Sequence, residues 1–157
     1  MTLNLKKALQ LKNIKMPFRF YFLMTSILII LIIPVNSCKK SDEVVPNVSV
    51  DIYMNISSTQ FTKLAAIGGW EYITGGVKGI IVYRKSQDEF IALERNCTYK
   101  PSNGCRIQVE KSGVTAIDSC CMSKFLILDG SVLHSPATTP LKQYRTSFDG
   151  TTLHIYN

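Results

Sequence analysis

Apolar and polar residues alternate along most of the chain from residue 48 onward. In residues 48–56 every second side chain is apolar, as in a strand with one buried face. Further short apolar or aromatic runs follow at residues 68–76, 79–84, 89–94, 106–110, 113–118, 126–133, 142–148 and 151–156. Only residues 61–66 suggest a helical turn, with Leu64 facing inward. Short strands at this spacing predict an all-β sandwich or small barrel.

Turn-forming residues separate these runs and predict hairpins between neighbouring strands. The segments at residues 85–88 and 111–113 are polar, and the second ends in glycine. Two Asp-Gly dipeptides, at residues 129–130 and 149–150, favour tight turns. We therefore expect mainly antiparallel pairing and no helix of ordinary length in this part of the chain.

The first 37 residues differ in composition from the rest. A 14-residue, almost unbroken apolar run at residues 20–33 follows five basic residues, which is the pattern of a signal peptide. A membrane-spanning helix needs about 20 apolar residues. The sequence Val-Asn-Ser-Cys that ends at Cys38 resembles a bacterial lipobox, in which the cysteine is acylated and becomes the mature N-terminus.

Two alternatives for this leader stay open. An uncleaved anchor helix could end at Pro34, and Met16 could be the true start. With or without cleavage, we expect a membrane tether outside the cytoplasm. Residues 38–47 then form a polar tether, and the charged segment at residues 39–43 resembles surface-export signals of Bacteroidetes lipoproteins.

The net charge of +7 belongs to the leader. Five of the 18 basic residues and none of the 11 acidic residues precede Cys38, which leaves 13 against 11, or +2, for the remainder. Such a balance is too small for a polyanion-binding surface, so nucleic-acid binding is excluded.

Three segments in the second half of the chain resemble the Rieske iron–sulfur signature. They are Cys97-Thr98-Tyr99, residues 118–125 (DSCCMSKF) and residues 135–141 (SPATTPL). Rieske domains hold a 2Fe-2S cluster with two cysteines and two histidines, supplied as Cys-x-His and Cys-x-x-His. The resemblance covers about residues 76–156. It implies a Rieske-like antiparallel β-sandwich of three small sheets for residues 48–157, with a cluster-binding subdomain inserted into a larger base.

The ligand positions are largely substituted. On the family pattern, Cys97 matches the first cysteine and Tyr99 stands at the first histidine. Asp118 takes the second cysteine position and Cys121 the second histidine position. A phenol, with an ordinary pKa near 10, is a poor ligand for such a cluster. We therefore expect no conventional cluster.

The chain's two histidines, His134 and His154, do not replace the missing histidine ligands. Neither has metal-ligand spacing to the other or to a cysteine, so we interpret both as ordinary polar residues. In the third segment, Pro136 and Pro140 match the proline loop that covers the cluster in the family, with Ser135 in place of a glycine.

The resemblance also implies a disulfide pattern. Rieske proteins of respiratory complexes often join their two cluster loops by an extra disulfide, and Cys105 and Cys120 resemble that pair. Cys97 and Cys121 then remain at former ligand positions, and we predict a second disulfide between them. The four cysteines that follow Cys38 are an even number, which suits a framework of two disulfides in an oxidising compartment. The competing arrangement, Cys97 with Cys120 and Cys105 with Cys121, stays open.

These observations predict a lipid-anchored envelope protein with a disulfide-stapled, cluster-free domain that serves as a structural or binding module. Its partners would be the membrane, through the anchor, and an envelope protein. The first alternative is an electron-transfer protein with an atypical 2Fe-2S cluster and a redox partner. The second is a site for zinc or copper that includes Cys97 and Cys121. An enzyme finds little support, because the chain lacks a nucleophile with a base and a phosphate-binding loop.

Overall fold

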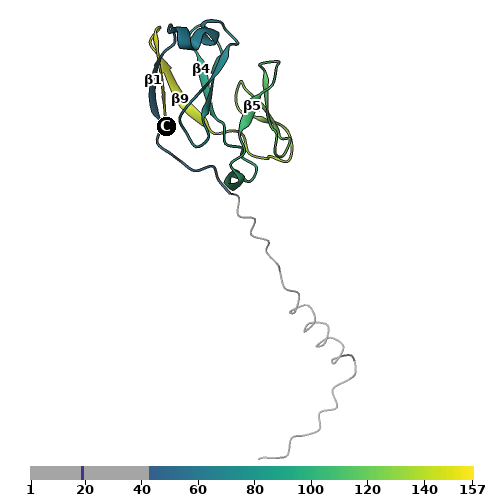
Figure 1. Ribbon diagram of the computed structural model, residues 1–157. Coiled ribbons are helices and arrows are strands. Elements are labelled where there is room, and N and C mark those ends of the chain that lie inside the picture. The colour runs from purple at the N-terminus through teal and green to yellow at the C-terminus, as the bar shows by residue number, and fades with distance from the viewer. Residues whose placement is uncertain (1–18, 20–42) are drawn as a thin grey trace, which may run out of the picture. The chain divides into compact units, whose positions relative to one another are not determined.

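The computed structural model describes Arg19 and residues 43–157 (Figure 1). The predicted signal peptide, except for Arg19, lies outside the described residues. The predicted lipidation site Cys38 and the start of the predicted tether lie outside them as well. None of the helical segments among the described residues could span a lipid bilayer. Residues 43–157 belong to one compact unit.

Antiparallel strands make up nearly all of the regular structure. The elements in chain order are β1 Asp51–Asn55, η1 Thr59–Ala65, β2 Trp70–Ile73, β3 Ile80–Arg84, β4 Phe90–Glu94, η2 Pro101–Asn103, β5 Ile107–Val109, β6 Thr115–Asp118, β7 Lys124–Leu126, β8 Val132–His134, β9 Gln143–Phe148 and β10 Thr152–Tyr156. Both helical elements are short 3-10 turns, and the first contains the predicted inward-facing Leu64. The predicted all-β fold is confirmed.

The larger sheet has the strand order β1-β10-β9-β4-β3-β2. Strand β9 connects its two parts, because it pairs with β4 through Gln143 and Tyr144 and with β10 from Arg145 onward. The smaller sheet, β5-β6-β7-β8, lies in the sequence between β4 and β9 and beside the larger sheet in Figure 1. It is therefore an insertion into a base, as the resemblance implied.

One predicted turn differs in detail. The Asp-Gly dipeptide at residues 129–130 predicted a tight hairpin, but β7 ends at Leu126 and β8 begins only at Val132. The reason is Ile127, whose side chain is 1% exposed and belongs to the core. Burying this residue takes the chain out of the strand early, and the turn becomes longer.

Strand β3 separates two apolar clusters. Successive strand side chains point to opposite faces, so Ile80 and Val82 contact the cluster of the base, with Leu153 and Ile155. Ile81 faces the other cluster, which lies between the base and the insertion. That second cluster contains Leu93, Ile107, Ala116, Phe125 and also Cys97. The first predicted ligand position is therefore anchored in the core.

A buried carboxylate fixes the end of β4. Glu94 is fully buried, and Oε1 accepts hydrogen bonds from the backbone N–H groups of Lys78 and Asn96, both at 2.9 Å. Oε2 accepts from the Val77 N–H and the Tyr144 hydroxyl, both at 2.7 Å. These four bonds join β4, β9 and the loop after β2 just before the chain reaches Cys97.

Glycine is required beside this carboxylate. Gly76 has a φ of +61°, and a Cβ there would lie 2.2 Å from Glu94 Oε2 and 2.6 Å from the Tyr144 hydroxyl. Neither neighbour can withdraw without losing a buried hydrogen bond.

The Glu94 network leads to a stability prediction. In Glu94→Gln an amide NH₂ group replaces one carboxylate oxygen and can no longer accept hydrogen bonds from the two donors that face it. We expect this substitution to lower the free energy of unfolding by about 2–4 kcal/mol. Tyr144→Phe removes one donor and leaves the other three bonds intact, so about 1 kcal/mol is expected. Urea unfolding of the full chain in detergent measures both. Equal midpoints for Glu94→Gln and the wild type would contradict this role of the carboxylate.

Candidate functional site

Two loops of the insertion meet at the candidate site. The first loop follows β4 and contains Cys97, whose backbone N–H donates to the Cys105 carbonyl at 3.1 Å. The second loop follows β6, where the Asp118 N–H donates to the Ser123 carbonyl at 2.9 Å and the Met122 N–H donates back to the Asp118 carbonyl at 2.7 Å. This tight turn places Cys121 opposite the first loop.

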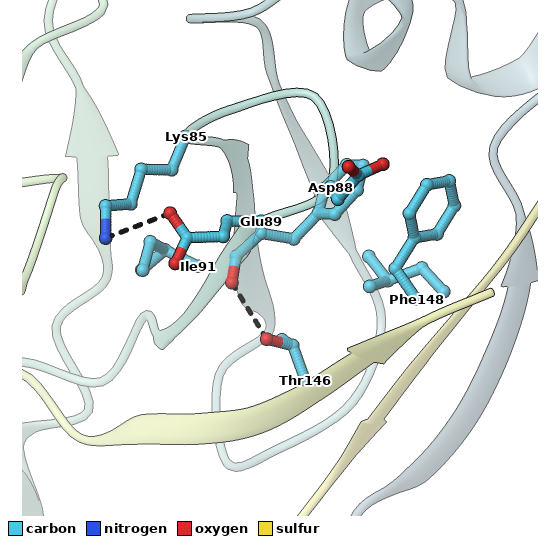
Figure 2. A pocket seen from close by; sticks show the side chains of 8 residues that line it. Lys85, Asp88, Glu89, Ile91, Thr146 and Phe148 are labelled. Atoms are coloured by element: carbon cyan, nitrogen blue, oxygen red, sulfur yellow. Dashed lines mark hydrogen bonds and ion pairs between the residues drawn. The ribbon is translucent and has the colours of Figure 1, made fainter. Parts of the chain in front are cut away.

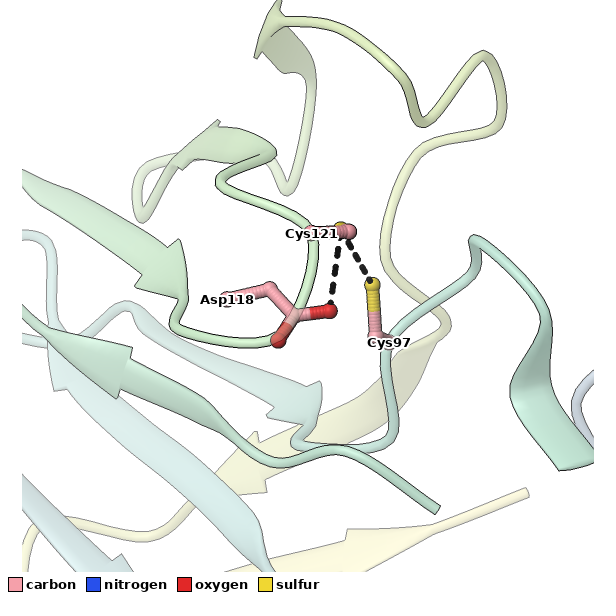
Figure 3. A group of neighbouring side chains, drawn as sticks. All are labelled: Cys97, Asp118 and Cys121. Carbon is pink, nitrogen blue, oxygen red and sulfur yellow. Dashed lines mark hydrogen bonds between the residues drawn. The ribbon is translucent and has the colours of Figure 1, made fainter. Parts of the chain in front are cut away.

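Three potential ligand side chains converge between the loops. Figure 3 shows Cys97 pointing from one loop toward Asp118 and Cys121 on the other. The two Sγ atoms are 3.9 Å apart, and Cys121 Sγ lies 3.1 Å from Asp118 Oδ2. All three ligand atoms lie within 4.8 Å of one another. Cys97 and Asp118 are each 1% exposed, whereas Cys121 is half-buried and can be reached from solvent.

The surroundings keep the Cys97 thiol protonated. Burial raises its pKa well above the ordinary value, because a thiolate would lose its hydration there, and the hydrogen bond to Asp118 and the carboxylate charge raise the pKa further. The Tyr99 backbone N–H, 3.4 Å from Sγ, acts in the opposite direction. Without a cation beside it, Cys97 is a neutral thiol at neutral pH.

A disulfide connects the same two loops. Cys105 and Cys120 are bonded, with a sequence separation of 15 and a distance of 6.3 Å between their Cα atoms. This is the pairing that the resemblance implied. The competing arrangement, in which Cys97 pairs with Cys120 and Cys105 with Cys121, is not present in the structure.

The second predicted bridge is not formed in the structure. Cys97 and Cys121 are free thiols, and their Sγ separation of 3.9 Å is well beyond the roughly 2.05 Å of a disulfide. The Cys121 thiol lies instead against two oxygens, Asp118 Oδ2 at 3.1 Å and Ser123 Oγ at 3.0 Å. The polar neighbours hold the sulfur away from its partner.

Tyr99, the remaining former ligand position, and the two histidines lie outside the group of three potential ligands. Tyr99 packs against the core cluster between the sheets, and Lys100 Nζ lies 5.5 Å from its ring centre. The exposed His134 lies on β8, outside the group of three ligands. His154 lies on β10 in the base, 2.6 Å from Asp51, and stacks on Tyr53. Both imidazoles are therefore outside the converging set.

The proline-containing segment is bonded to both loops. The Ala137 N–H donates to Ser123 Oγ at 2.8 Å, and the Thr98 hydroxyl donates to the Thr139 carbonyl at 2.6 Å. Pro136 and Pro140 are exposed, so they form the outer side of this cover. Sequence reasoning did not identify Ser123 as a site residue, although it is fully buried. Its position between Cys121 and Phe125 in the family pattern was the available signal.

A pocket on the base is a weaker candidate for a binding site. It is lined by residues of the β3–β4 turn and of strands β4, β9 and β10, among them Asp88 and Phe148 (Figure 2). Lys85 and Glu89 form an ion pair at 3.3 Å, and the Thr146 hydroxyl donates to the Phe90 carbonyl at 2.8 Å. These polar groups already bond to one another, so the loop site is the stronger candidate.

Comparisons with known proteins find similar solved structures. No protein-family model and no curated protein matches the sequence. The chain is similar to the crystal structure of the cyanobacterial plasma membrane Rieske protein PetC3 from Synechocystis PCC 6803, with 19% sequence identity and a TM-score of 0.49. The match covers 69% of this chain and 98% of that one.

The disulfide leads to a second prediction. The double substitution Cys105→Ala with Cys120→Ala opens a loop of sequence separation 15, and we expect it to lower the free energy of unfolding by about 3 kcal/mol. Reduction of the wild-type chain should lower its unfolding midpoint to the same value, while the double variant should not respond to reductant. A reductant-sensitive double variant would contradict the assigned pairing.

Proposed function

We propose that this protein is a lipid-anchored cell-envelope protein whose Rieske-like domain serves as a binding or structural module without a 2Fe-2S cluster. The observation that carries the proposal is the donor set between the two loops. Two thiols and one carboxylate converge there, and neither histidine of the chain takes part.

The arrangement of the insertion supports a Rieske-like domain. A four-stranded sheet is inserted between β4 and β9 of the base. Its two ligand-bearing loops are joined by the Cys105–Cys120 disulfide, and a proline-containing segment is bonded to both. These are the features that the sequence resemblance implied, now found in one place.

The donors do not fit a Rieske cluster. Such a cluster requires four terminal ligands, two cysteines on one iron and two histidines on the other. Here Cys105 and Cys120 are joined to each other, so Cys97 and Cys121 are the remaining thiols of the described chain. Together with Asp118 they surround a single point, since all three ligand atoms lie within 4.8 Å. Two irons with two ligands each cannot be assembled from this set.

The disulfide also supports a location outside the cytoplasm. Disulfides form and persist in oxidising compartments and are rare in the cytosol. The apolar run at residues 20–33 and the lipobox-like sequence at Cys38 point to the same compartment. Membrane attachment would then come from the lipid on Cys38, and an envelope protein is the expected partner.

The anchor can be tested directly in a bacterial host that processes lipoproteins. We expect labelled palmitate to be incorporated into the wild-type chain and into Ser37→Ala, which keeps a small residue before the cysteine. Cys38→Ser should carry no label, because it lacks the acylated thiol. Equal labelling of Cys38→Ser would show that lipid is attached elsewhere or that the label is not specific.

The cluster proposal has its own measurement. The full chain, purified anaerobically in detergent, should be colourless and contain no stoichiometric iron. A triple variant, Tyr99→His with Asp118→Cys and Cys121→His, restores the family ligands and is the control for a scaffold able to take up a cluster. A brown wild-type protein with two irons per chain would overturn the proposal in favour of electron transfer.

A further inference from the structure

An unpaired carboxylate lies in the core beside the two thiols. Asp118 is 1% exposed, and none of the ion pairs among the described residues includes it. Its Oδ1 accepts from the Cys120 N–H at 2.8 Å, while Oδ2 faces Cys121 Sγ at 3.1 Å. Buried carboxylates are ordinarily paired with a cation or bound to a metal. The position beside Oδ2 is therefore where a positive charge would be stabilised.

The separation of the two sulfurs matches that of two ligands on one tetrahedral ion, and the carboxylate oxygen lies close enough to join them. With zinc–sulfur bonds of about 2.3 Å, two thiolates on one tetrahedral zinc lie about 3.8 Å apart. The observed Sγ separation is 3.9 Å. A thiolate and a carboxylate oxygen on the same ion lie about 3.6 Å apart, so the 3.1 Å between Cys121 Sγ and Asp118 Oδ2 has to lengthen by a few tenths of an ångström. Half-buried Cys121 leaves the fourth position open to water.

Hydrogen bonds from neighbouring groups already orient these donors. The Cys120 N–H holds Asp118 Oδ1, which directs Oδ2 toward the sulfurs, and the Tyr99 N–H lies 3.4 Å from Cys97 Sγ. Ser123 Oγ lies 3.0 Å from Cys121 Sγ and accepts from the Ala137 N–H, which ties the second loop to the proline-containing segment. Such outer contacts fix ligand orientation in metal sites.

We propose that Cys97, Cys121 and Asp118 bind one zinc ion, with water as the fourth ligand. Two thiolates and one carboxylate suit a borderline cation such as Zn²⁺, whereas Mg²⁺ and Ca²⁺ prefer all-oxygen sites. Binding releases the two thiol protons to solvent, so Zn²⁺ replaces two protons and no electron is transferred. The zinc site rests on the proposed function in one respect, because it requires that no iron cluster occupies the loops. Zinc would then be the ligand of the proposed binding module.

Zinc binding can be measured on the full chain in detergent. Metal is first removed with a chelator, and Zn²⁺ is then titrated against a chromogenic competitor. We expect one zinc per chain and a weakening of at least about 100-fold in Cys97→Ser and Cys121→Ser. Asp118→Asn should weaken binding by about 10–100-fold, on the scale found when supporting groups of metal sites are lost. Asp88→Asn, an exposed acidic residue outside the site, is the matched control and should bind as the wild type does.

Two further readouts keep the test independent of variant folding. Co²⁺ in place of Zn²⁺ should give the intense visible bands of a tetrahedral thiolate site, and zinc should slow alkylation of Cys121 in the wild-type chain at least tenfold. No binding by a chain with two free thiols, or a Cys97–Cys121 disulfide that persists with zinc present, would overturn the zinc site alone. Two irons per chain would overturn both the zinc site and the cluster-free function.

Discussion

The covalent bond between Cys105 and Cys120 joins two loops from different hairpins, and the candidate site depends on that connection. One loop follows β4 and the other follows β6. The loops are also connected through the pairing of β5 with β6 and through the proline-containing segment, which is bonded to both. The disulfide limits their separation, so that Cys97 on one loop faces Asp118 and Cys121 on the other.

The base fixes the first loop by a different means. Glu94 ends β4, three residues before Cys97, and its four buried hydrogen bonds hold the strand, β9 and the loop after β2 together. Cys97 itself packs in the apolar cluster between the sheets. The position of its sulfur is therefore set by core packing, which is rigid, and the second loop must adapt to it.

The donor residues define what the candidate site can bind. On the resemblance described above, a phenol and a thiol stand where the Rieske pattern has histidines, and a carboxylate stands where it has a cysteine. Cys97, Cys121 and Asp118 offer ligand atoms within 4.8 Å of one another, which is close enough to surround one ion. Asp118 is in none of the ion pairs among the described residues, and buried carboxylates are ordinarily paired with a cation or bound to a metal.

The sequence alone determined the antiparallel all-β fold, because alternation in runs such as residues 48–56 is a local signal. The resemblance to the Rieske signature implied the pairing of Cys105 with Cys120, but only the tertiary structure distinguished it from the competing arrangement. The Asp-Gly pattern predicted a tight turn after β7, but the observed turn is longer around Ile127, whose burial the local sequence does not show. The separation of Cys97 and Cys121 as thiols, and the roles of Ser123 and Glu94, were decided by tertiary structure. Each depends on polar atoms brought together from distant segments, and no periodicity in the chain encodes those distances.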